Sequence, residues 1–159
     1  PYVEAVTGPL LSGFEDGEPP LLILEPGRAV VSDAVDLVAT VVASKEIPSG
    51  RRAVVIDAGV NLLPTSFWRH QTVELIGNPE GEPKETIVYG PLCLQTDIIT
   101  RASLPPLGLG DMLVVKNVGA YNIPQSGTFI FPRPPIVLVE NGEPRVIRER
   151  ETVESAFFK

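Results

Sequence analysis

Short apolar or alternating segments, separated by turns that contain glycine or proline, recur along most of the chain. Alternation of apolar and polar side chains with a period of two is typical of strands that bury one face. The pattern predicts strands over residues 37–44, 53–56, 72–76, 86–89, 111–116, 136–139 and 145–148. The last two flank Asn141-Gly142, a dipeptide that favours a tight hairpin turn. We therefore expect a mainly β fold, a β-barrel or a β-sandwich.

The two ends of the chain show a different pattern. Residues 1–20 are rich in turn formers, and we expect them to be a connection without regular structure. The run Leu21–Leu24 is wholly apolar, as in a strand of a parallel sheet that is buried on both faces. Residues 29–36 can form a short helix. Residues 151–158 are expected to form a terminal helix, because acidic side chains lie in its first turn and Lys159 follows it.

Composition removes several functional classes. The 159 residues contain 14 glycines and 17 prolines, which suits many short strands joined by turns. The net charge of −7 argues against nucleic acid or an anionic membrane as a partner, because both select clustered positive charge. The sequence also lacks a run of about 18 apolar residues that could span a membrane.

The cysteine and histidine counts restrict the chemistry further. One cysteine and one histidine can supply neither a zinc site nor an internal disulfide, so we expect no metal. The same count favours a reducing, cytoplasmic setting. The chain opens with Pro1 and no signal segment, which suggests a fragment of a longer protein.

Several predicted strands end in a small-residue loop that carries one reactive or recognition group. Glu25 and Arg28 follow the first apolar run, and Asp57, Cys93 and Tyr121 each follow a later strand or its turn. Proteins with parallel sheets keep ligand-binding groups at the carboxyl ends of their strands. The segment 25–28 is therefore a candidate binding loop.

Six motifs follow one another in a distinctive order. They read Glu-Pro-Gly-Arg at 25–28, Asp-Ala-Gly at 57–59, Gly-Pro-Leu-Cys at 90–93 with an Asp four residues later, Gly-Asp at 110–111, Gly-Ala-Tyr at 119–121 and Pro-Arg-Pro at 132–134. In this order they resemble the C-terminal half of the pyridoxal-phosphate-dependent ornithine/diaminopimelate/arginine decarboxylases, which have an alanine-racemase-like fold (fold type III). The resemblance extends from about Leu21 to Phe158.

The resemblance implies a two-domain amino-acid decarboxylase that acts as a homodimer with shared active sites. Its N-terminal (β/α)8 barrel would carry the lysine that holds pyridoxal 5'-phosphate, and no lysine of this chain lies in such a motif. Residues 1–36 would then be the end of that barrel, and residues 37–159 the C-terminal β-domain. The expected partners are the barrel domain, a second subunit and an amino-acid substrate.

The resemblance also assigns residues to the cofactor. Glu25 would contact the cofactor's ring nitrogen, Gly27 and Arg28 would bind its phosphate, and Tyr121 would be a further phosphate donor. The guanidinium of Arg28 could also reach a substrate carboxylate. The residues alone leave plainer alternatives open, which are a surface glutamate at 25, an ion pair of Arg28 with Asp33 or Asp36, and a packing tyrosine at 121.

Cys93 is the predicted catalytic acid. By resemblance it would deliver a proton to the substrate's Cα after carbon dioxide leaves, reaching into the active site of the partner subunit. A thiol suits this task near neutral pH, although a lone cysteine is more often a small buried hydrophobe. Asp97 would orient the Cys93 loop or bind a substrate amine, and Leu94 would contact the substrate.

Two departures from the family pattern bear on the substrate. Family members that act on diamino acids carry an acid directly after this cysteine, and here that position is Leu94. The Arg-Pro and Tyr of the diaminopimelate enzymes are also missing, and Phe67-Trp68 lies in that region instead. We therefore expect a modified or conjugated amino acid. Decarboxylation of diaminopimelate itself, racemisation, and a non-catalytic β-barrel interaction module stay open as alternatives.

Overall fold

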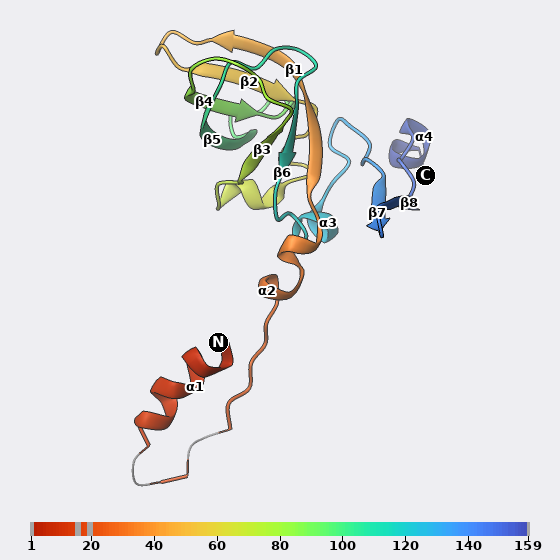
Figure 1. Cartoon of the computed structure of the whole chain (residues 1–159). Coiled ribbons are helices and arrows are strands. Elements are labelled where there is room, and N and C mark those ends of the chain that lie inside the picture. Colours follow the sequence, from red (N-terminus) through yellow and green to blue (C-terminus); the bar gives the residue numbers. More distant parts are fainter. Residues whose placement is uncertain (1, 15–16, 19–20, 159) are drawn as a thin grey trace.

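A curled six-stranded sheet forms the body of the protein (Figure 1). The computed structural model describes residues 2–14, 17–18 and 21–158. The strands are β1 (Leu37–Glu46), β2 (Arg52–Ile56), β3 (Val73–Ile76), β4 (Lys84–Tyr89), β5 (Ile98–Leu104) and β6 (Met112–Val115). Their order across the sheet is β3-β6-β1-β2-β4-β5. All neighbours are antiparallel except β2 and β4, which run parallel.

The curl of the sheet comes from β1, the longest strand. Its first half pairs with β6 and its second half pairs with β2, with an irregularity between Val41 and Ala43. At this bend the side chain of Asp57 accepts a hydrogen bond from the Thr40 backbone N–H at 2.7 Å, and the Asp57 N–H donates to the Thr40 carbonyl at 3.0 Å. Asp57 thus supports the bend that lets one strand serve both halves of the sheet.

The core lies inside this curl. It is built from alternate side chains of the strands and from apolar residues of the loops that follow them, as the period of two predicts. The most deeply buried large side chains are Val41, Val54, Ile56, Leu63, Val88, Ile99, Leu113 and Val115. The predicted mainly β fold is therefore confirmed. Each strand predicted between residues 37 and 148 is present, and its ends lie within two residues of the predicted ones.

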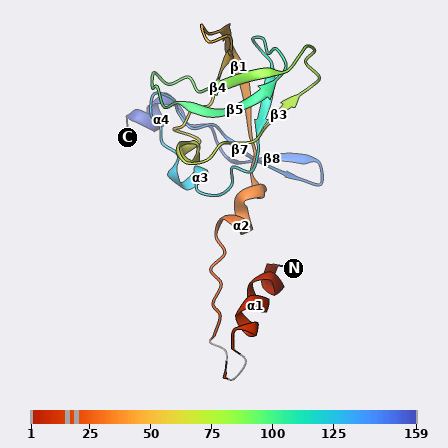
Figure 2. The ribbon, with the colours of Figure 1, turned by 90° about the vertical axis from the view of Figure 1, so that its left-hand side faces the viewer.

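The other described elements are short helices and one hairpin. They are α1 (Tyr2–Ser12), α2 (Arg28–Val31), the 3-10 turns η1 (Ser32–Ala34) and η2 (Pro64–Phe67), α3 (Asn122–Gln125), the hairpin strands β7 (Ile136–Glu140) and β8 (Glu143–Arg148), and α4 (Val153–Phe157). Both views show α1 standing apart from the sheet, and residues 21–27 run as an extended segment into α2 (Figures 1 and 2). None of the helices in the described ranges is long and apolar enough to cross a membrane.

Three expectations from the sequence need correction. Residues 2–12 form α1, although we predicted an irregular connection there. The strand predicted at Leu21–Leu24 is an extended, exposed segment, because no strand of the described chain pairs with it. Strand β5 was not predicted, because its polar residues Thr100 and Arg101 interrupt the apolar pattern. The positions of Pro19, Pro20 and Lys159 lie outside the described residues.

Candidate cofactor and proton-donor site

Three of the predicted cofactor residues come together at the start of α2. The guanidinium carbon of Arg28 lies 5.2 Å from the centre of the Tyr121 ring, a distance typical of a cation–π contact. A Cβ atom placed on Gly27 would lie 3.6 Å from the Tyr121 hydroxyl, so the backbone approaches that hydroxyl closely. Tyr121 is 45% exposed. Gly27 and Tyr121 are exposed and Arg28 is partly buried, so a guanidinium and a phenol lie side by side next to a backbone segment without a side chain.

The alternative ion pairs of Arg28 are not formed. Among the described residues Arg28 pairs with neither Asp33 nor Asp36, and Asp36 binds the ammonium group of Lys116 and the backbone N–H of Asn117 instead. Burial acts to raise the pKa of Asp36, but these two hydrogen bonds outweigh it and hold the pKa below its usual range. Arg28 therefore stays directed at Tyr121.

The loop that carries Tyr121 is fastened to the segment that carries Arg28. The Gly119 N–H donates to the Ser32 carbonyl at 3.0 Å, and the Val118 N–H donates to the Val35 carbonyl at 2.8 Å. A Cβ on Gly119 would collide with the Val31 carbonyl oxygen, so only glycine permits this approach. The Gly-Ala-Tyr motif thus needs its glycine for contact between the two segments.

Glu25 lies apart from this group. It sits on the extended segment before α2 and is exposed, and no contact joins it to Arg28 or Tyr121 among the described residues. Its role toward the ring nitrogen stays a prediction.

Cys93 and Leu94 form a second exposed group, in the connection between β4 and β5. The side chain of Leu94 is 42% exposed, and its backbone N–H donates to the Leu92 carbonyl at 2.8 Å. The plain alternative for Cys93, a small buried hydrophobe, does not describe the structure, since the thiol is exposed. The described contacts do not join Cys93 to Arg28 or Tyr121 within one chain.

Asp97 lies directly behind the cysteine loop and is only 1% exposed. One carboxylate oxygen accepts from the Val60 N–H at 2.8 Å and the other accepts from the Leu92 N–H at 2.7 Å. A Cβ on Gly90 would collide with this carboxylate, at 2.4 Å from both oxygens, and a Cβ on Gly59 would come within 3.1 Å of one of them. Burial raises the pKa of Asp97, and the two backbone hydrogen bonds oppose that rise. Asp97 therefore holds the cysteine loop against the loop that follows β2.

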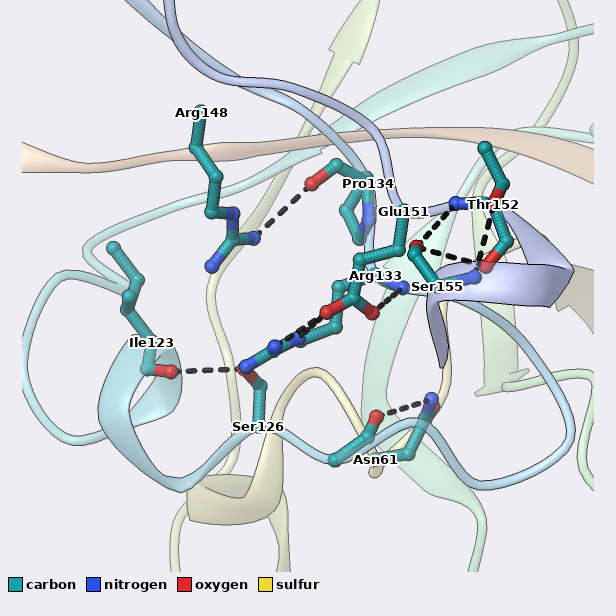
Figure 3. A network of polar contacts seen from close by, with 10 residues as sticks. Asn61, Ile123, Ser126, Arg133, Pro134, Arg148, Glu151, Thr152 and Ser155 are labelled. Atoms are coloured by element: carbon teal, nitrogen blue, oxygen red, sulfur yellow. Dashed lines mark hydrogen bonds and ion pairs between the residues drawn. The ribbon is translucent and has the colours of Figure 1, made fainter. Parts of the chain in front are cut away.

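The Pro-Arg-Pro motif is anchored by an ion pair that the sequence did not reveal (Figure 3). The Arg133 Nε and backbone N–H donate to the two oxygens of Glu151 at 2.8 and 2.9 Å. These hydrogen bonds, the guanidinium first, lower the pKa of Glu151 to about 2. Beside them Arg148 donates to the Pro134 carbonyl at 3.1 Å. The network fixes the start of the hairpin to the start of α4.

One further polar residue was missed by sequence reasoning. Asn122, next to Tyr121, is 3% exposed and joins two loops by its side-chain amide. A polar residue inside a loop carries no periodic signal, so only its neighbour Tyr121 in the motif marked the place.

The chain is similar to a family of known proteins. The profile of the family described as "Pyridoxal-dependent decarboxylase, C-terminal sheet domain" matches residues 29–119. The diaminopimelate decarboxylase of Methanothermobacter thermautotrophicus is 38% identical over 138 residues, which cover 84% of this chain and 32% of that protein. That of Bacillus subtilis is 34% identical over 142 residues, covering 85% of this chain and 32% of that protein.

Solved structures give the same result. A crystal structure of diaminopimelate decarboxylase from "m. jannaschi" superposes with a TM-score of 0.80 at 30% identity, covering 96% of this chain and 36% of that one. The chain thus spans about a third of the length of the relatives that it matches. Because the family profile covers more than half of the chain and the fold agrees, the chain belongs to the C-terminal sheet domains of the pyridoxal-dependent decarboxylases.

Proposed function

We propose that this chain supplies the phosphate contacts and the proton donor of a pyridoxal-phosphate-dependent amino-acid decarboxylase. In this proposal residues 1–36 end the cofactor-binding barrel and residues 37–159 are the C-terminal β-domain. The observation that carries the proposal is the cluster of Gly27, Arg28 and Tyr121, partly open to solvent, which the fold assembles from two distant segments. Membership of the family supports it.

The cluster fits a phosphate group. Arg28 offers a planar pair of N–H donors that suits two phosphate oxygens, and the Tyr121 hydroxyl adds a third donor. The missing side chain at Gly27 leaves room beside that hydroxyl. When bound there, pyridoxal phosphate would supply an electron sink for the bond that breaks at the substrate's Cα. Glu25 would keep a proton on the ring nitrogen.

Cys93 would hold a proton on its Sγ atom and deliver it to Cα after carbon dioxide has left. A positioned acid contributes on the order of 10²- to 10⁴-fold to such a step. Asp97 would hold the loop that carries Cys93 in place and would not bind substrate, since both of its oxygens already accept backbone hydrogen bonds. The exposure of Cys93 allows its thiol to reach a neighbouring subunit.

The role of Cys93 can be tested by the variant Cys93→Ala in the full-length protein. Cofactor binding should remain, as judged by the visible absorbance band, while turnover falls by about 10²-fold or the product changes. Cys93→Ser is the matched control for size, and Gln95→Ala, at an exposed position of the same loop, controls for disturbance of the loop. A Cys93→Ala variant with full rate and the same product would refute the assignment. A full-length protein that binds no pyridoxal phosphate would favour the non-catalytic module.

The proposal includes a homodimer with shared sites, in which Cys93 of one subunit would serve the Arg28 and Tyr121 of the other. Mixing Cys93→Ala with Arg28→Ala subunits tests it, because a mixed dimer would then contain one intact site. Random mixing should restore roughly a quarter of the activity, since half of the dimers are mixed and each has one working site of two. If each active site is built from one chain, no activity will return.

The substrate proposal rests on Leu94, which is exposed beside Cys93 and uncharged. We infer a substrate whose distal end carries no free ammonium, such as a modified or conjugated amino acid; the exposed rings of Phe67 and Trp68 are further apolar surface. The relatives' names favour diaminopimelate as the second candidate.

A carbon dioxide release screen separates the two substrates. Amino acids, diaminopimelate and N-acylated or otherwise conjugated derivatives should be compared by kcat/KM. Leu94→Glu should shift preference toward diamino acids, because a carboxylate would then face the distal ammonium. Diaminopimelate as the best substrate of the unaltered protein would replace our first candidate with the second.

A further inference from the structure

Tyr121 has an unusual backbone conformation. Its φ and ψ are 68° and −33°, and the Asn122 N–H donates to the Ala120 carbonyl at 2.9 Å. A hydrogen bond from residue i+2 to residue i around a positive φ is a γ-turn of the rare, strained kind. Such a conformation is unfavourable in a non-glycine residue and persists only where the surroundings impose it.

The hydrogen bonds before Tyr121 do not impose this turn. The loop is fixed to α2 and η1 through Gly119 and Val118, and Asp36 holds the N–H of Asn117. All these bonds lie upstream of the Tyr121 φ and ψ angles. They bring the loop close to Arg28, but rotation at Tyr121 would still be free.

On the other side of Tyr121, its carbonyl accepts from the Gln125 N–H at 3.0 Å within α3, and α3 is in turn tied to the sheet domain by the side chain of Asn122. Its Oδ1 accepts from the Thr65 N–H at 3.1 Å, and its Nδ2 donates to the Val118 carbonyl at 3.1 Å. The residue is 3% exposed, so both bonds are buried and costly to lose. An amide is the side chain that can accept and donate at once from this position.

We propose that Asn122 is a positioning residue of the phosphate cluster. Its buried amide ties η2 to the loop that follows β6 and thereby holds the γ-turn at Tyr121. The turn directs the Tyr121 hydroxyl toward Gly27 and its ring toward Arg28. This inference rests on the proposed function, because it needs Tyr121 to contact the phosphate, and it adds a residue that acts through Tyr121 without touching the cofactor.

A double-mutant cycle in the full-length protein tests the inference. The apoprotein would be titrated with pyridoxal phosphate and with pyridoxal, which lacks the phosphate, and binding followed by absorbance. The variants are Tyr121→Phe, Asn122→Ala and the two combined. Thr86→Val is the control, because Thr86 is also buried and hydrogen-bonded but lies in β4, away from the cluster.

Asn122→Ala should weaken pyridoxal phosphate binding by about tenfold, similar to the loss of one hydrogen bond, and leave pyridoxal binding unchanged. In the Tyr121→Phe background the same substitution should have little further effect, because the hydroxyl that it positions is gone. Thr86→Val should leave both affinities unchanged. If Asn122→Ala does not fold, Asn122→Asp, which keeps the acceptor for Thr65, replaces it in the cycle.

Two kinds of failure are distinguishable. If Tyr121→Phe binds pyridoxal phosphate as well as the unaltered protein, the phosphate role of Tyr121 in the proposed function is wrong. If Tyr121→Phe weakens binding but Asn122→Ala does not, the inference alone is overturned. Equal losses for pyridoxal and its phosphate, or fully additive effects in the cycle, would overturn it as well.

Discussion

At the scale of single residues, the carboxylate of Asp97 decides the shape of the cysteine loop. It accepts backbone hydrogen bonds from two loops, after β2 and after β4, that are far apart in the sequence. Buried N–H groups must find acceptors, and a carboxylate with two oxygens can serve both. The thiol of Cys93 can therefore be exposed while the backbone that carries it stays fixed.

The first prediction concerns this carboxylate. Asp97→Asn keeps the shape of the side chain but turns one acceptor into a donor that faces a backbone N–H. Leaving that buried group unpaired should cost about 1–3 kcal/mol of unfolding free energy. Denaturant unfolding measures it, with Asp33→Asn, an exposed acid, as the control. Equal stability of Asp97→Asn and the unaltered protein would contradict the structural role.

The second prediction concerns glycine beside the same carboxylate. Gly90→Ala should destabilise the protein by on the order of 1–3 kcal/mol, because its Cβ would overlap Asp97 and force the loop to move. Gly127→Ala is the matched control, since nothing lies within 4 Å of the Cβ that it would add. Thermal unfolding of the two variants should differ clearly; similar melting temperatures would speak against the tight packing.

Residue roles were only partly accessible to sequence reasoning. The order of motifs marked Gly27, Arg28 and Tyr121, and the structure brings these three together. Sequence reasoning could not decide whether Asp97 orients the Cys93 loop or binds a substrate amine, because the burial of Asp97 depends on contacts from a distant loop. Asn122 was missed, since its hydrogen-bond partners are set by the tertiary fold and leave no local pattern.

At the scale of elements, alternation predicted the strands that bury one face well. It failed for β5, where Arg101 and Thr100 lie within the strand, and for α1, where Gly8 and Pro9 were taken as turn formers. The extended segment Leu21–Leu24 shows a third limit, because an apolar run becomes a strand only beside a hydrogen-bonding neighbour. The composition of a segment therefore does not tell whether a neighbouring strand is present to pair with it.

The third prediction concerns the ion pair between Arg133 and Glu151, which joins the start of the hairpin to the start of α4. The pKa of Glu151 is lowered from its usual 4.5 to about 2 by Arg133. A lowered pKa in the folded state means that the stabilisation is present above about pH 4.5 and is lost as the pH falls toward 2. Plots of unfolding free energy against pH should therefore converge for the unaltered protein and Glu151→Gln near pH 2.

Arg133→Gln is the control for this titration, because it removes the partner and leaves the carboxylate. It should abolish the same acid-dependent loss of stability that Glu151→Gln abolishes. If either variant keeps the full pH dependence of the unaltered protein between pH 2 and 4.5, the ion pair is not its source.

At the scale of the whole molecule, buried apolar side chains are distributed unevenly between the large sheet and the hairpin. The buried core belongs to β1–β6, whereas the hairpin β7–β8 carries exposed apolar side chains such as Val139 and Ile147. A groove of roughly 700 Å³ separates this hairpin from the start of β1 and from α3. An isolated two-stranded sheet is only marginally stable in water.

The fourth prediction follows from this distribution. Amide hydrogen exchange should be slowest at buried positions of the large sheet, such as Val54, Val88 and Leu113, and much faster in β7–β8. Mass spectrometry of peptides from this 159-residue chain would measure it. Protection of the hairpin as strong as that of the sheet would show that stability is not divided in this way.

The packing of Gly59 and Gly90 around Asp97 also has a consequence for the history of the domain. The three positions fill one small volume, so a larger residue at either glycine leaves no space for the acid, and loss of the acid removes the need for both glycines. Among related sequences the three should thus be kept or lost as one set. A lineage that has replaced Asp97 should tolerate side chains at 59 and 90, and its cysteine loop should be free to diverge.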